Sequence, residues 1–345
     1  LTTVINSGKT TNGKKYGLVP KFAEIFNAEN DNNEEAVFAI QSSMNTGNTN
    51  NANGFDDLNY PYNTGADGPG NCCGFFQPTF SMANAYRTVG GLPILTEQAD
   101  GTPDYNLPAN AVKNDYGVNS TAAFTEDADP LDPRIDHTIG RRGIQYLDWI
   151  EHPGANWIRS QVYAGPYSPK KYVYYKRQEN TLTDGSGWTR GYATMNFNII
   201  RFADVLLLAA EAEIEAGSLT TALGYINQIR NRAANPDGFV MKGGKAEANY
   251  QIKPYTAFAN KAEATSALRM ERLLELATEG HRFFDLVRWG IASKTLNAYL
   301  KYESKWLVTK FGGAKYTSGK DEYLPIPQAQ IDIQGSSVLK QNPGY

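Results

Sequence analysis

Two neighbouring segments in the C-terminal half repeat apolar residues with helical spacing, and this pattern constrains the fold more than any other feature of the chain. The first segment has apolar residues at i, i+3, i+4 and i+7, namely Phe202, Val205, Leu206 and Ala209. The second repeats the spacing with Ala222, Tyr225, Ile226 and Ile229. Gly217 ends the first segment and the Asn235-Pro236 turn ends the second. Two amphipathic helices joined by a Gly-Ser link predict a helical hairpin with the length of a tetratricopeptide unit.

A second pair of helices is predicted further along the chain. A helix opens near Asn260, where Glu263 is placed for a capping box. One face of this helix carries Met270, Leu273, Leu274 and Ala277. Gly280 breaks it, and a fourth helix follows with Phe283, Phe284, Leu286 and Val287. At least two helical hairpins are therefore expected, separated by an insertion at about residues 236–260.

The rest of the chain is less regular. Residues 34–40 and 171–178 are rich in strand-forming side chains. Residues 80–94 predict a helical turn or two closed by Gly90-Gly91. We therefore expect a mainly α protein, with a loop-rich lobe containing short strands at 1–195 and helical hairpins with a C-terminal tail at 196–345.

The composition excludes several classes of protein. The 345 residues carry a net charge of −3, which argues against a general affinity for nucleic acid. The most apolar run, residues 203–210, is short and contains Asp204, so it predicts no membrane span. The two cysteines, Cys72 and Cys73, are adjacent and supply neither a disulfide framework nor a zinc site. The chain opens at Leu1 without a secretion signal, so we expect a trimmed piece of a longer chain.

Eight segments carry a resemblance to a known family. Five lie in the C-terminal half: "RFADVLLLAAEAEIEAG" (201–217), "INQIRNRA" (226–233), "ERLLELATEGHRFFDLVRWG" (271–290), "YLPIPQAQI" (323–331) and "QNPGY" (341–345). Three weaker ones precede them: "EEAVFAIQ" (34–41), "GGLPI" (90–94) and "LDPRIDHTIG" (131–140). In this order they resemble the signatures of the SusD/RagB family.

The resemblance implies a function. Members of this family are outer-membrane lipoproteins of Bacteroidetes, exposed on the extracellular face. They bind nutrients, usually glycans, and act as the lid of a SusC-like TonB-dependent transporter. They are built from tetratricopeptide-like hairpins and an irregular region that carries much of the ligand face. The resemblance implies no catalytic residue, no cofactor and no bound metal. The family's acylated cysteine and first helical hairpins are not found in this chain, so any membrane contact is expected only through an N-terminal lipid anchor that is not present here.

Two acidic clusters are better explained by structure than by catalysis. Glu271, Glu275 and Glu279 fall at i, i+4 and i+8 on the third predicted helix. We expect them to form a solvated stripe that pairs with nearby arginines, namely Arg269, Arg272 and Arg282. His281, just past the helix end, is expected to contact the last helix carbonyls. The second cluster comprises Asp127, Asp129, Asp132 and Asp136. It lacks the Gly turn and terminal Glu of a calcium loop, and a rigid turn with Asp–Arg134 pairing is expected instead.

The candidate ligand site is the loop at residues 59–76. Aromatic rings accept the flat C–H faces of sugars, and amides and carboxylates bind the hydroxyls. The candidate ligand-binding residues are Tyr60, Tyr62, Asn71, Cys72, Cys73, Phe75 and Phe76, together with Trp157, which follows a turn-rich "HPGAN" that predicts an exposed ring. The alternative is that some of these rings fill the core.

Adjacent cysteines leave two possibilities open. In an oxidising compartment they can form a vicinal disulfide, a stiff apolar knob that braces the loop or touches ligand. The α-carbons across a trans peptide lie ~3.8 Å apart, below the usual disulfide range. The other possibility is two free buried thiols.

The expected function is capture of an oligo- or polysaccharide for uptake, without a reaction. The alternatives are a peptide-binding member of the same family and, less expected, an enzyme acting on glycosides.

Overall fold

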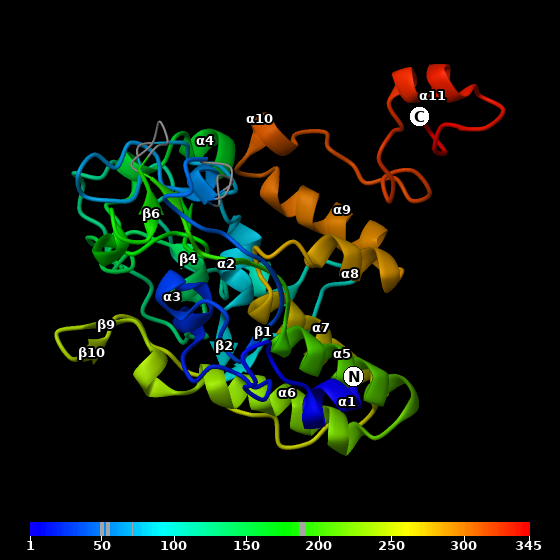
Figure 1. Ribbon diagram of the computed structural model, residues 1–345, viewed down its shortest axis with the longest axis horizontal. Helices are drawn as coiled ribbons and strands as arrows, with labels where there is room; N and C mark the ends of the chain where they lie inside the picture. Colours follow the sequence, from blue (N-terminus) through cyan, green and yellow to red (C-terminus); the bar gives the residue numbers. More distant parts are fainter. Residues whose placement is uncertain (49–51, 53–55, 71, 186–190) are drawn as a thin grey trace.

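The structure is a computed structural model that describes residues 1–48, 52, 56–70, 72–185 and 191–345 (Figure 1). The helices of the first half are short: α1 (Thr2–Ser7), α2 (Phe80–Ala85), α3 (Ile135–Thr138) and α4 (Gln161–Ala164). Those of the second half are α5 (Phe202–Ala216), α6 (Leu219–Ala233), α7 (Lys261–Glu275), α8 (Arg282–Arg288), α9 (Ala292–Glu303), α10 (Val308–Phe311) and α11 (Gln328–Gln334). The mainly α prediction is confirmed.

The strands form two-stranded antiparallel sheets. The pairs are β1 (Ala36–Ile40) with β8 (Phe197–Arg201), β2 (Thr88–Val89) with β3 (Leu92–Pro93), β4 (Ile139–Gly140) with β5 (Ser168–Pro169), β6 (Thr183–Asp184) with β7 (Tyr192–Ala193), and β9 (Met241–Lys242) with β10 (Lys245–Ala246). The β1–β8 pair joins the beginning of the chain to the start of α5. Consequently the irregular first half and the helical second half share one strand ladder.

The predicted helical hairpin is present. α5 and α6 are joined by Gly217 and Ser218 and pack against each other and α7. The Ser218 side chain accepts a hydrogen bond from Thr221 N–H and caps α6. The apolar residues of the three helices form one buried cluster: Phe202, Ala203, Val205, Leu206, Leu207, Ala210, Ile214, Ala222, Ile226, Ile229, Ala264, Ala267 and Leu268. The helical periodicity of the sequence therefore corresponds to a real buried face.

The second predicted pair of helices is also present, with two differences. The Asn260 side chain accepts from Glu263 N–H at 3.0 Å, while the Glu263 carboxylate accepts from Ala259 N–H and not from the cap residue itself. His281 is the N-cap of α8 and makes no capping hydrogen bond through its side chain. Helix α9, which packs on α8, was not predicted from the sequence.

Two local predictions in the first half are wrong. Residues 171–178 do not form a strand: Tyr172 has φ +57°, outside the strand region, and a short 3-10 turn, η7 (Lys176–Gln178), follows. Tyr172, Val173 and Tyr174 belong to a buried cluster and not to a ladder. Gly90-Gly91 does not close a helix but forms the turn of the β2–β3 hairpin, with φ +57° and +84°.

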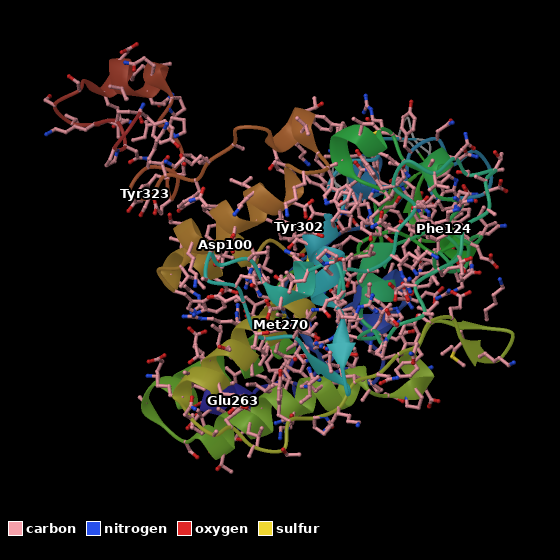
Figure 2. All side chains as sticks on the ribbon, turned by 180° about the vertical axis from the view of Figure 1, so that it is seen from behind. Asp100, Phe124, Glu263, Met270, Tyr302 and Tyr323 are labelled. Carbon is pink, nitrogen blue, oxygen red and sulfur yellow. A yellow bond between two sulfur atoms is a disulfide. The ribbon has the colours of Figure 1, made fainter. Side chains whose placement is uncertain are left out.

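The end of the chain stands apart from the rest. The segment that carries α11 extends away from the body (Figure 1). Figure 2 shows Tyr323 on this segment, whereas Met270 and Tyr302 lie within the body. No helix among the described residues is long and apolar enough to cross a bilayer.

The acidic stripe of α7 is buried, which corrects the expectation of a solvated face. Glu271 and Glu275 are fully buried, and Glu279, just past the helix, is nearly so. Their partners are not the neighbouring arginines of the helix. The three glutamates belong to a central ion network of five carboxylates and five cations: Glu35, Asp132, Glu271, Glu275, Glu279, Arg134, Lys171, Arg201, Arg230 and Arg232.

Arg201 occupies the middle of this network. Its guanidinium donates to Glu279 at 2.7 Å, to Glu35 at 2.8 Å and to Glu275 at 2.6 Å. Because Arg201 ends β8 and Glu35 precedes β1, the network fastens the two-stranded sheet to α7. The Asp132–Arg134 pair at 2.7 Å brings the predicted Asp-rich turn into the same network.

The charges of the network compensate one another. Burial by itself would raise the pKa of Glu275, but Arg232, Arg201 and Arg134 lower it below the ordinary value. Burial raises the pKa of Glu35 in spite of the opposing effect of Arg232 and Arg201. A buried carboxylate is tolerated only when it is paired. With all ten groups ionised, the five negative and five positive charges of the network balance, and these charges serve the architecture.

A buried carboxylate links α9 to α2. The fully buried Glu303 accepts a hydrogen bond from Ser81 N–H at 2.6 Å, in the first turn of α2. Burial raises the pKa of this carboxyl to about 7, although the Ser81 and Phe80 backbone oppose the shift. The folded state therefore holds the proton more tightly than the unfolded state, so the stability from this group is present below its unfolded pKa and is lost as pH rises through about 7.

Glu303→Gln should consequently stabilise the protein at alkaline pH. At pH 8 we expect the free energy of unfolding to rise by roughly 2 kcal/mol, because the amide removes the buried negative charge. Near pH 4.5 the difference should vanish. Urea unfolding at the two pH values measures it. Glu215→Gln, at an exposed position, is the control and should have little effect at either pH. An equal effect of Glu303→Gln at both pH values would contradict the prediction.

Candidate functional site

Three aromatic side chains are exposed together with one arginine at the end of the long N-terminal loop. The relative exposures of Tyr62, Phe75 and Phe76 are 37%, 45% and 67%. The Arg159 guanidinium carbon lies 5.8 Å from the Tyr62 ring centre and 5.2 Å from that of Phe75. We call these four residues the aromatic platform. Large rings left in solvent side by side are characteristic of interaction surfaces.

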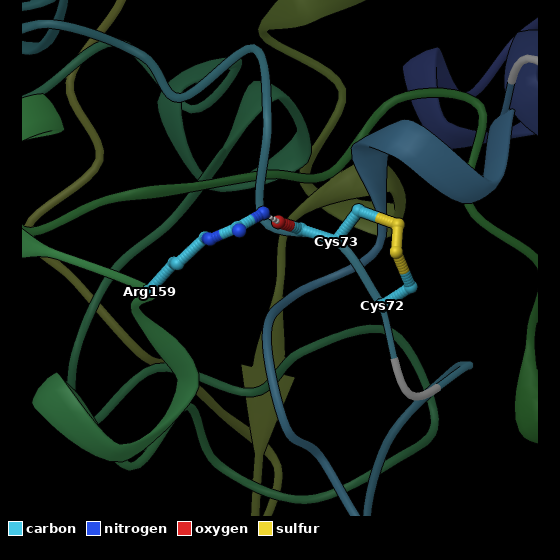
Figure 3. Close-up of a disulfide and its surroundings, with 3 residues drawn as sticks. All are labelled: Cys72, Cys73 and Arg159. Atoms are coloured by element: carbon cyan, nitrogen blue, oxygen red, sulfur yellow. Dashed lines mark hydrogen bonds between the residues drawn. A yellow bond between two sulfur atoms is a disulfide. The ribbon is translucent and has the colours of Figure 1, made fainter.

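Arg159 holds the platform together. One Nη of its guanidinium donates a 3.4 Å hydrogen bond to the carbonyl of Cys73 (Figure 3). The same side chain interacts with the Tyr62 and Phe75 rings, which restrains both side chains through cation–π contacts. No feature of the sequence pointed to Arg159, because it lies 84 residues beyond Phe75 in a segment without periodicity.

The backbone fixes the position of the loop. Tyr62 N–H donates to the Trp157 carbonyl at 2.9 Å, so the loop that carries Tyr62 is joined to the segment that carries Arg159. Gly74 N–H donates to the Tyr60 carbonyl at 3.0 Å and Phe75 N–H to that of Leu58 at 3.0 Å. These bonds close the loop on itself and keep Tyr62 and Phe75 on the same side.

Two of the predicted ligand residues lie beneath the platform. Trp157 is 3% exposed and Tyr60 is 0% exposed, so the prediction of an exposed Trp157 ring is wrong. The Trp157 ring packs edge-on against Tyr146 and His152 with ring centres 5.5 and 5.4 Å apart. A Cβ at Gly68 would lie 2.7 Å from the Trp157 ring. The Trp157 ring is buried because the turn before it leads the ring inward, where it lies against Gly68 of the loop.

Cys72 and Cys73 are joined in a disulfide. The peptide between them is cis, with α-carbons 3.1 Å apart, and not trans as the sequence analysis assumed. Cys73 is buried and Cys72 is partly exposed. Asn71, also a predicted ligand residue, lies outside the described residues.

The platform continues toward α4 and α10. Arg159 lies two residues before α4, on which Val162 and Tyr163 are exposed. α4 and α10 pack together (Figure 1), and the Lys310 ammonium lies 5.6 Å from the centre of the Tyr163 ring. Trp306, just before α10, is also exposed. Tyr163 could not be assigned to a surface from the sequence, because single rings in irregular segments usually pack in the core.

Two buried carboxylates of the predicted Asp-rich cluster are paired with arginines. Asp127 pairs with Arg87 at 2.7 Å, and Asp136 pairs with Arg141 at 2.6 Å. Among the described residues, no group of three or more His, Cys, Asp or Glu side chains has the geometry to hold a metal ion. What the site offers chemically is apolar ring faces with a cation beside them, which suits binding.

Comparison with known proteins places the chain among relatives. A sequence profile of the SusD family matches residues 34–345. The SusD-like protein P25 of Formosa agariphila is 26% identical over 284 residues, which cover 80% of this chain and 44% of that protein. The starch-binding protein SusD of Bacteroides thetaiotaomicron is 24% identical over 350 residues, covering 96% of this chain and 54% of that protein. The chain spans about half the length of these curated relatives.

Solved structures share the fold. A SusD superfamily protein from Bacteroides vulgatus has a TM-score of 0.58 and 22% identity, with 100% of this chain and 57% of that chain covered. Surface glycan-binding protein A from Bacteroides fluxus has a TM-score of 0.58 and 20% identity over the same fractions. At these identities the likeness concerns the fold.

Proposed function

Because the chain belongs to the SusD family, we propose that it binds an oligo- or polysaccharide on the aromatic platform. The observation that supports the proposal is the set of exposed rings Tyr62, Phe75 and Phe76. The Arg159 guanidinium lies against the first two of them. Similarity to a starch-binding protein and to a surface glycan-binding protein supports the same class of ligand.

The chemistry of the platform suits a sugar chain. The C–H face of a pyranose ring rests on an aromatic face, while the Arg159 guanidinium beside the rings donates to hydroxyls. Tyr62 contributes both an apolar face and a phenolic hydroxyl. Tyr60 and Trp157 act from below by positioning the loop, and the Cys72–Cys73 knob braces its partly exposed edge. Such a surface binds weakly and through bridging waters, because hydroxyls remain partly hydrated.

The place of the protein in uptake follows from the family. We propose a position on the extracellular face of the outer membrane, where the protein captures glycan and passes it to a SusC-like TonB-dependent transporter. No reaction is part of this proposal: the ligand enters and leaves chemically unchanged. The hairpins of α5 to α9 would supply a tetratricopeptide-like scaffold, and the loop-rich first half would supply the ligand surface.

Calorimetric titration with a panel of defined oligosaccharides tests the proposal. For the best ligand, we expect Phe75→Ala to weaken binding roughly tenfold, the effect of removing one well-placed aromatic contact. Tyr323→Ala is the matched control, because that ring is exposed on the C-terminal segment away from the platform (Figure 2), and it should leave the affinity unchanged.

Three outcomes would count against the proposal. Unchanged affinity in both Phe75→Ala and Tyr62→Ala would move the glycan site elsewhere. Absence of binding across the whole panel would favour the peptide-binding alternative, and turnover of an oligosaccharide during titration would favour an enzyme.

A further inference from the structure

A separate cavity lies between the helices of the second half and the α2 region. Its volume is about 190 Å³. The lining comes from α2, α7, α8, α9 and the segment around η5 (Asp104–Asn106). Its walls are mainly apolar and aromatic, with Met82, Tyr105, Leu273, Leu286, Leu296 and Tyr299 among them. One charged side chain, Arg282, completes the lining.

Arg282 differs from the buried arginines of this protein. Within the described part of the chain, each buried arginine has a carboxylate within 4.0 Å, namely Arg87, Arg134, Arg141, Arg201, Arg230, Arg232 and Arg272. Arg282, which is partly buried, has no carboxylate at that distance among the residues that the structure describes. It donates one long hydrogen bond, 3.4 Å, to the carbonyl of Arg269.

The surroundings of Arg282 do not supply the missing charge. The nearest acidic residue of α8, Asp285, is already paired with Arg272 and Arg288, each at 2.7 Å. Burial lowers the pKa of Arg282 from its ordinary value, and the nearby Arg269 and Arg272 act in the same direction, against Tyr105 and Asp285. A guanidinium that loses part of its hydration gains most from an anion or several acceptors beside it. The lining thus contains a partly buried cation that no carboxylate of the described residues neutralises, with the centre of the Trp289 ring 6.0 Å from its guanidinium carbon.

We propose that this cavity binds a small organic monocarboxylate, whose apolar body fills the space between Leu273, Leu286 and Leu296 and whose carboxylate pairs with Arg282. The volume limits the ligand, since an apolar cavity of about 150 Å³ accommodates a benzene ring. An aromatic or branched aliphatic acid of benzoate size therefore fits, and a disaccharide does not. The site shares no residue with the aromatic platform, so the inference does not depend on the proposed glycan function.

Calorimetry with sodium benzoate and with benzamide tests the proposal on the unmodified protein. The two probes have nearly the same shape and differ in charge. We expect benzoate to bind at least tenfold more tightly, because a charge-assisted hydrogen bond to a partly buried guanidinium is worth more than about 1.4 kcal/mol, or tenfold in affinity. Equal affinities for the two probes, or no binding of benzoate, would overturn the proposal.

Three variants locate the site. Arg282→Gln should abolish the preference for benzoate, whereas Arg282→Lys should retain part of it. Leu296→Phe, which fills the cavity, should prevent binding of both probes. Arg177→Gln, an exposed arginine of the other half, should change nothing. If Arg282→Gln is well folded by circular dichroism and binds benzoate as the unmodified protein does, the assignment to this cavity is wrong.

Discussion

Replacing Arg201 by Met is expected to lower the free energy of unfolding by about 4 kcal/mol or more, because it removes a cation shared by three buried carboxylates. Arg201 donates to Glu35, Glu275 and Glu279, and all three acids are withdrawn from water. Met fills a similar volume, so the loss measures charge and not packing. Urea unfolding followed by circular dichroism gives the value.

Two further variants test whether the loss of stability comes from the buried ion pairs. Arg177 forms an ion pair with Glu29 at 2.9 Å, but both side chains are exposed, so Arg177→Met should cost less than about 1 kcal/mol. Removing a carboxylate together with its cation should recover part of the loss: Arg201→Met with Glu279→Gln should be more stable than the sum of the single effects predicts. Equal losses for Arg201→Met and Arg177→Met would show that the central ion network does not carry the stability assigned to it.

Trp157→Ala should be the second large effect, with a loss of about 3–5 kcal/mol of folding stability from the cavity left in the core. The ring contacts Tyr146 and His152 and lies under Gly68. Phe75→Ala removes a ring of comparable size from the same site, but that ring is 45% exposed, so its stability cost should be below about 1 kcal/mol. Thermal unfolding of the two variants side by side measures the difference.

The two variants distinguish a ring that supports the loop from a ring that contacts the glycan. Trp157→Ala should weaken glycan binding only indirectly, through a looser loop, whereas Phe75→Ala should weaken it while the fold remains unchanged. A Trp157→Ala protein that keeps its full stability would mean that the ring is not part of the core. A Phe75→Ala protein that loses as much stability as Trp157→Ala would mean that the platform is structural.

The helices that carry the fold could be predicted because their information is local. The apolar spacing from Phe202 to Ala209, the stop at Gly217 and the cap at Asn260 all act within a few residues of the backbone they determine. The strand predicted at 171–178 failed for the opposite reason. The segment has the composition of a strand, but Tyr172, Val173 and Tyr174 fill a buried cluster whose members come from distant segments.

The candidate site, like the fold, could be predicted from the sequence only in part. The rings of the loop could be identified from composition, since Tyr62, Phe75 and Phe76 stand in a Gly- and Asn-rich segment. Their exposure could not be predicted in this way. Tyr60 and Phe75 are both aromatic residues of the same loop, and what packs on them decides which one is buried. Arg159 and the exposed residues of α4 were missed because their relation to the loop exists only after folding.

The sequence by itself determined the family, the amphipathic helices and the loop that carries the candidate site, because periodicity, caps and motif order are properties of neighbouring residues. Only the tertiary structure decided that Glu271, Glu275 and Glu279 are buried and paired. Their cations come from segments as far apart as Arg134 and Arg232, and a charge at helical spacing has the same pattern whether water or a distant guanidinium neutralises it. It also decided which rings face solvent, since burial depends on what the rest of the chain places above each one.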